Sequence, residues 1–139
     1  MRVVVGAAAA LAAAVGPAWA QGAGATIQAF GLVGTWSSDC AHPDGYRMIF
    51  AVPGKGAPTR TVITSNGAKT TTTKAEILGA SRLGSTGLVI EARVTGGDRD
   101  GGPLPASALL GLDQSFEKAG PNVLYVKGHD PMRLERCGK

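Results

Sequence analysis

The sequence predicts an all-β domain, a small antiparallel up-and-down barrel or sandwich of about eight strands. From Gly34 onward, short segments rich in β-branched or alternating apolar residues recur between clusters of turn residues, a pattern typical of such domains. After residue 20, no helical period of apolar residues persists for ten positions. The dipeptide Asn66-Gly67 is a strong hairpin signal.

The first half of this domain contains a strand that opens at Gly34 and a second at 46–52, ended by the turn residues 53–56. The second strand alternates, so that alternate residues face opposite sides of the sheet. One of its faces carries Tyr46, Met48, Phe50 and Val52.

The middle of the chain predicts a hairpin followed by a further strand. Segments 59–64 and 69–78 flank Asn66-Gly67, and the second of them contains four consecutive threonines, whose branching favours strand over helix. The next strand covers 88–94. One of its faces carries Leu88, Ile90, Ala92 and Val94.

The last third predicts three closing strands, at 114–118, 123–127 and 132–137. Before them, the glycine-rich segment 96–102 is expected to be a mobile turn. The segment 106–112 fits either a strand or a short helix capped by Ser107. The residues expected to face the interior are Trp36, Met48, Phe50, Ile90, Ala92, Val94 and Leu134.

Residues 1–20 have the pattern of a cleavable export signal. A positive start is followed by an apolar run and by Ala18 and Ala20 at the positions that a signal peptidase requires to be small. The alternative, a membrane anchor, is disfavoured because the run is short and mostly alanine. We therefore expect a periplasmic or secreted protein without a stable membrane anchor, with a flexible N-terminal tail at 21–33 and a single β domain at 34–139.

The two cysteines predict one disulfide, between Cys40 and Cys137. Both follow the export signal, and an even number of cysteines in an oxidising compartment favours pairing. A thiol metal site is the alternative, but the chain has no CxxC spacing and no further soft ligands near them. No metal and no cofactor are predicted.

Charge and composition argue against a nucleic-acid partner. Lysine and arginine number 14 against 10 acids, and the basic residues are scattered among the acidic ones rather than gathered into an arm. Aromatic residues make up 5% of the chain, too few for a platform of stacked bases.

No catalytic motif is present, so the sequence does not predict an enzyme. The chain has two histidines, His42 and His129, and we expect them at opposite ends of the sheet, too far apart to share a metal. No serine lies in a G-x-S-x-G elbow. Four glutamates occupy positions expected to face solvent, namely Glu76, Glu91, Glu117 and Glu135.

The tripeptide Gly34-Thr35-Trp36 at the start of the first strand resembles the G-x-W motif of the lipocalin–avidin (calycin) superfamily. In that superfamily the tryptophan closes one end of a meandering barrel and packs against an arginine of the final strand. The resemblance implies the same structural role for Gly34 and Trp36, with Arg136 as the expected partner and Arg133 as the second candidate.

From these observations we expect a binding protein whose ligand or partner the sequence does not determine. One target is a small apolar molecule held in the mouth of the barrel. The alternative is a protein partner bound through loops or the tail, as in the periplasmic inhibitor of secreted metalloproteases, a G-x-W barrel that the chain resembles in size and export. The cysteines of that inhibitor close a shorter loop than Cys40 and Cys137 would close in this chain. An envelope hydrolase using His42 or His129 is a third hypothesis.

Overall fold

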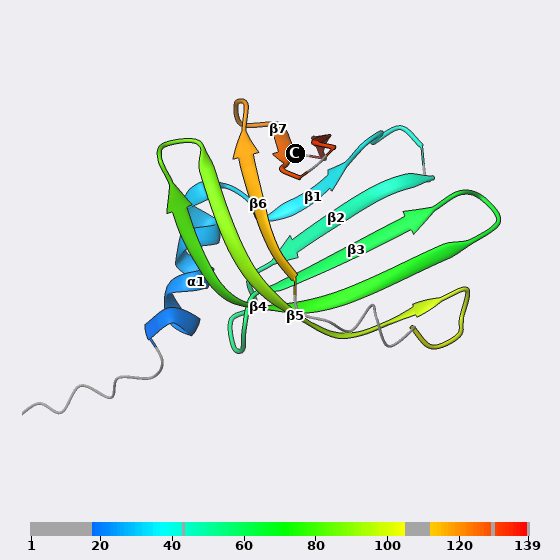
Figure 1. Cartoon of the computed structure of the whole chain (residues 1–139), viewed down its shortest axis with the longest axis horizontal. Coiled ribbons are helices and arrows are strands. Elements are labelled where there is room, and N and C mark those ends of the chain that lie inside the picture. Colours follow the sequence, from blue (N-terminus) through cyan, green and yellow to red (C-terminus); the bar gives the residue numbers. More distant parts are fainter. Residues whose placement is uncertain (1–17, 43, 105–111, 129, 139) are drawn as a thin grey trace, which may run out of the picture.

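The protein is a closed eight-stranded barrel preceded by one helix (Figure 1). The computed structural model describes residues 18–42, 44–104, 112–128 and 130–138. The elements are α1 (Ala18–Phe30), β1 (Gly34–Ser37), β2 (Gly45–Ala51), β3 (Thr59–Ser65), β4 (Thr70–Leu83), β5 (Gly87–Arg99), β6 (Leu112–Lys118), β7 (Val123–Val126) and β8 (Met132–Cys137).

Every strand pairs antiparallel with the next, and β1 pairs with β8 to close the ring. This confirms the predicted fold class and decides between its two forms in favour of the up-and-down barrel. Closure satisfies the backbone groups that a sandwich would leave unpaired at its edge strands.

The interior follows the alternation in the sequence. All seven residues that were expected to face inward are buried: Trp36, Met48, Phe50, Ile90, Ala92, Val94 and Leu134. Phe50 and Phe116 meet edge to face across the core, with ring centroids 5.7 Å apart, a favourable arrangement for two aromatic rings.

The long hairpin of β4 and β5 differs from the sequence-based prediction. Segment 96–102 was expected to be a turn from its glycines, but β5 continues to Arg99. The ladder shifts register at Lys74/Ala75, opposite this stretch. A Cβ atom at Gly97 would lie 2.0 Å from the carbonyl oxygen of Thr72, so glycine here permits a close strand pairing rather than a turn.

The predicted flexible tail at 21–33 is wrong for most of its length, because residues 18–30 form α1. Ala23, Ile27 and Phe30 are buried and belong to the same core as the barrel interior. Their spacing of four and three residues puts them on one helix face. Leu32, fully buried in the link to β1, completes this packing.

Helix α1 distinguishes the two ends of the barrel. Figure 1 shows α1 beside β4 on the left and the β3–β4 hairpin on the right. We call the end with α1, the β4–β5 hairpin loop (84–86) and the β6–β7 turn (119–122) the closed end. The end with the β3–β4 loop (66–69) is the open end.

The predicted disulfide is present in the structure. Cys40 and Cys137 are bonded, and they join the segment after β1 to the end of β8. The bond is consistent with an oxidising compartment. In the described part of the chain, no helix is both long enough and apolar enough to span a bilayer. Most of the predicted export signal, residues 1–17, lies outside the described residues.

Candidate functional site

Trp36 and Arg136, the partners that the resemblance implies, are in contact at the closed end. The guanidinium carbon of Arg136 lies 4.2 Å from the centre of the Trp36 ring, and the two residues are direct partners in the β1–β8 ladder. The indole N–H of Trp36 donates to the carbonyl oxygen of Leu32 at 2.8 Å. Arg133, the second candidate, is exposed and pairs with Glu135 instead.

The position of the Arg136 side chain requires a glycine at residue 34. The backbone of Gly34 has φ of 127°, and a Cβ atom there would lie 2.9 Å from Nη1 of Arg136. That nitrogen donates to the carbonyl oxygen of Val33 at 2.7 Å, while Nη2 donates to that of Gly31. Glycine therefore lets the guanidinium reach the backbone that precedes β1.

The expected separation of the two histidines stays a prediction, because the structure describes one of them. His42 is exposed and lies 3.7 Å from Asp39, measured from Nε2 to Oδ2, and His129 lies outside the described residues. Across the described ranges, no group of three potential metal-ligating side chains occurs. The unassigned segment 106–112 also lies outside them except for Leu112, which begins β6.

A hollow of about 510 Å³ lies at the open end. Its inner side includes one cross-strand row made of Tyr46, Thr64, Thr71 and Arg99, on β2, β3, β4 and β5. Tyr46 lies two positions from the buried Met48 on the same face of β2, so this row lies on the inner face of the barrel. The remaining lining residues are Gly45, Ser65, Asn66, Lys69 and Asp100.

Arg60 lies two rows deeper in the barrel, paired with Phe50 and Ala75. It is 2% exposed, and its Nη1 donates to the side-chain oxygen of Gln114 on β6. Its Nε has no hydrogen-bond partner, and among the ion pairs of the described residues none involves it. Arg60 is therefore a buried cation whose charge no described carboxylate neutralises.

Tyr46 connects the hollow to this cation. Burial raises the pKa of Tyr46 above its ordinary value, and the nearby charge of Arg60 partly opposes that rise. Burial also lowers the pKa of Arg60, because a low-dielectric surrounding disfavours the charged form. The charges of these two side chains therefore influence each other inside the barrel.

Sequence reasoning did not find Arg60. In segment 59–64, Arg60, Val62 and Thr64 share one face, while Thr61 and Ile63 share the other. Both faces mix polar and apolar residues, so the pattern does not show which one is buried. Only pairing with the clearly alternating β2 places Arg60 opposite Phe50 and inside the barrel.

Comparisons with known proteins identify no relative: the chain matches no protein-family model, no curated protein and no solved structure. The fold is compatible with the calycin resemblance, since it is an eight-stranded antiparallel closed barrel.

Proposed function

We propose that this protein is an exported binding protein that takes up a small organic anion, with a carboxylate as its charged group, through the open end of the barrel. The observation that carries the proposal is Arg60, a buried guanidinium without an ionic partner among the described residues. The anion would supply the charge that this guanidinium lacks.

A buried guanidinium such as that of Arg60 needs partners for its charge. Removing a cation from water is unfavourable by several kcal/mol unless ionic and hydrogen-bonding partners replace the lost hydration. Arg60 has one described hydrogen bond, to a neutral amide. A bound carboxylate would form charge-assisted hydrogen bonds with it, and arginine matches a carboxylate in geometry because both are planar and bidentate.

The hollow at the open end, which is lined by Tyr46 but not by Arg60, has the size of a site for such a ligand. Its volume of about 510 Å³ lies in the range of small-molecule sites, roughly 300–1,000 Å³. Hydroxyl groups, the cations Lys69 and Arg99 and the acid Asp100 line it, so the body of the ligand would meet polar groups near the rim, with cations in excess by one. These features favour an anion over the wholly apolar molecule that the sequence suggested.

The two alternatives from the sequence receive less support. The inhibitor-like mode needs a free N-terminal segment, whereas Ala23, Ile27 and Phe30 bury one face of α1 in the core. The hydrolase hypothesis needs reactive histidines, and His42 is an exposed residue beside Asp39.

The test replaces Arg60 by methionine, which keeps an extended side chain and removes the charge. We expect Arg60→Met to abolish binding of linear monocarboxylates of increasing chain length, measured by the shift in melting temperature that bound ligand causes. Without ligand, the variant should be more stable by about 1–4 kcal/mol, because a poorly compensated buried charge has been removed.

The matching carboxamides serve as the ligand control, since they have the same shape without the charge. Equal binding of amides and acids to the natural protein would contradict the proposal, and so would undiminished binding of acids to Arg60→Met. Loss of stability in Arg60→Met without ligand would show that Arg60 has a structural role instead.

A further inference from the structure

Three cations, Arg82, Lys118 and Arg136, lie near Phe30 and the C-terminal end of α1, away from the open end. Arg82 of β4 and Lys118 of β6 lie over the Phe30 ring, at 5.0 and 5.6 Å from its centre. The pKa of Lys118 is lowered by burial and further by the charges of Arg136 and Arg82. The three positive charges are therefore close enough to influence one another.

Two carboxylates of β6 and β8 near this cluster are already paired elsewhere. Glu117 of β6 binds Lys127 at 3.0 Å, and Glu135 of β8 binds Arg133 at 2.8 Å. Within the described ranges, no ion pair involves any of the three cations around Phe30. The cluster therefore has an excess of positive charge.

Capping of the helix explains two of these cations. Lys118 donates to the carbonyl oxygen of Phe30 at 2.9 Å, and Arg136 donates to that of Gly31. Cations are favourable at this end of a helix because the last carbonyl groups carry partial negative charge. Arg82 has no such role, since its hydrogen bond goes to the carbonyl oxygen of Ser85 in its own hairpin.

A cleft of about 300 Å³ lies between Arg82 and Lys118. The hydroxyl-bearing residues Ser85 and Thr86 line it together with the Phe30 ring. An exposed guanidinium, an ammonium and two hydroxyl groups are the donors that bind a phosphate group, which offers several acceptor oxygens around one charge centre.

We propose that this cleft is a second binding site, which takes a phosphate group. The site is independent of the proposed function, because it lies at the opposite end of the barrel and shares no lining residue with the open-end hollow. Two sources can supply the group: free inorganic phosphate, or the headgroup of an anionic phospholipid. The exposed Leu83 at the tip of the same hairpin, 56% accessible, makes the second source worth a separate measurement.

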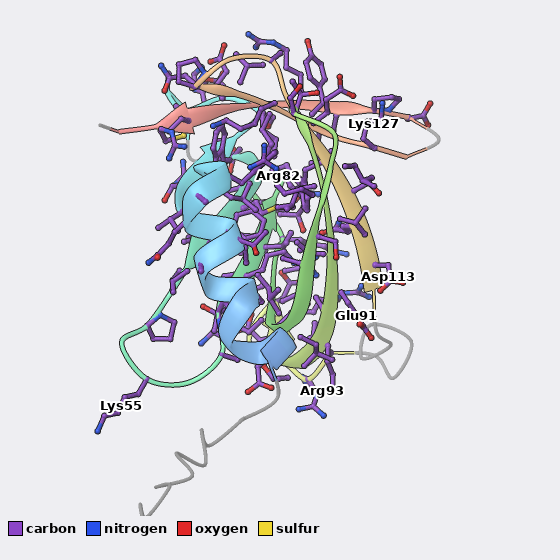
Figure 2. The ribbon with its side chains drawn as sticks, turned by 90° about the vertical axis from the view of Figure 1, so that its left-hand side faces the viewer. Lys55, Arg82, Glu91, Arg93, Asp113 and Lys127 are labelled. Atoms are coloured by element: carbon purple, nitrogen blue, oxygen red, sulfur yellow. A yellow bond between two sulfur atoms is a disulfide. The ribbon has the colours of Figure 1, made fainter. Side chains whose placement is uncertain are left out.

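The experiment compares Arg82→Gln with Arg93→Gln. Both variants remove one exposed arginine from the β4–β5 pair, but Arg93 lies toward the other end of it and pairs with Glu76 at 3.1 Å (Figure 2). Amide chemical shifts of Ser85 and Thr86 are followed during titration with inorganic phosphate, against chloride at the same ionic strength. Sedimentation with phosphatidylglycerol vesicles, against phosphatidylcholine vesicles, tests the lipid source.

We expect saturable binding in at least one of these two titrations. Arg82→Gln should weaken it about tenfold, the loss expected for one charge-assisted hydrogen bond, whereas Arg93→Gln should leave it unchanged. Arg82→Lys, which keeps the charge, should retain part of the binding. Arg60→Met should also retain it, so this proposal and the proposed function can fail separately.

Two results would overturn the inference. The first is that neither inorganic phosphate nor phosphatidylglycerol vesicles bind the natural protein. The second is that Arg82→Gln and Arg93→Gln reduce binding equally, because this would show a general attraction to a positively charged protein rather than a site.

Discussion

Arg136 links three parts of the chain at the closed end. Its guanidinium stacks on Trp36 of β1, donates to the carbonyl oxygens of Gly31 and Val33 before that strand, and reaches the carbonyl oxygen of Pro121 in the β6–β7 turn. In contrast to Arg60, its polar groups have several partners. The two arginines thus differ in whether the fold itself supplies hydrogen-bond partners for the guanidinium group.

The first prediction concerns Arg136. Arg136→Ala removes the stacking on Trp36 and leaves carbonyl oxygens before β1 without a donor, so we expect a loss of about 2–4 kcal/mol in the free energy of unfolding. Urea denaturation measures it. Arg133→Ala is the matched control on the same strand, where an exposed ion pair contributes little. Equal effects of the two substitutions would refute the role assigned to Arg136.

At the scale of elements, α1 is a helix that depends on its packing. Its sequence includes Gly22 and Gly24, and glycine in a helix is unfavourable by roughly 1 kcal/mol each relative to alanine. Packing against β4 and the core compensates for this weak propensity. The small size of Gly24 also helps, since its Cβ position lies 3.2 Å from a methyl group of Val52.

The helix is compatible with the proposed export signal. Cleavage before Gln21 would remove the helical residues 18–20 and keep Ala23, Ile27 and Phe30, the buried residues of the helix face. The exported domain would thus retain the contacts through which α1 packs at the closed end.

The second prediction tests the packing of α1. Ile27 is fully buried, so Ile27→Ala should lower the free energy of unfolding by about 2–5 kcal/mol through lost burial and the cavity left behind. Gln28→Ala, next to it on the exposed side, should have almost no effect. Both are measured by thermal or urea denaturation. An unchanged midpoint for Ile27→Ala would mean that the segment behaves as the free tail suggested by its composition.

At the scale of the whole molecule, the disulfide joins the segment after β1 to the end of β8, next to the seam where these two strands close the barrel. β1 and β8 are adjacent through backbone pairing, and Cys40 and Cys137 are 97 positions apart in sequence. The bond therefore restricts nearly the whole barrel in the unfolded chain, which is where the chain-entropy model places most of its stabilising effect.

The third prediction follows from this loop length. Replacing Cys40 and Cys137 together by serine should lower the free energy of unfolding by about 4–5 kcal/mol, measured by denaturant titration without reductant. Reductant should destabilise the natural protein toward the same value and leave the double variant unchanged. A natural protein whose melting temperature is insensitive to reductant would contradict the prediction.

The sequence by itself determined the all-β class, the approximate number of strands, the buried faces of β2 and β5 and the pair of cysteines, whereas the contact of Trp36 with Arg136 was implied by the resemblance to G-x-W barrels. These features depend on short-range alternation, turn residues and the identity of a few side chains, all of which can be recognised locally. The closed barrel, the helical state of α1 and the burial of Arg60 were decided only in the tertiary structure. Each depends on contacts between segments distant in sequence: β1 with β8, α1 with β4, and Arg60 with Gln114 across the interior. Whether a weak helix forms, and which face of an ambiguous strand is buried, depends on the surface against which the segment packs. That surface comes from distant segments, so the local sequence cannot reveal it.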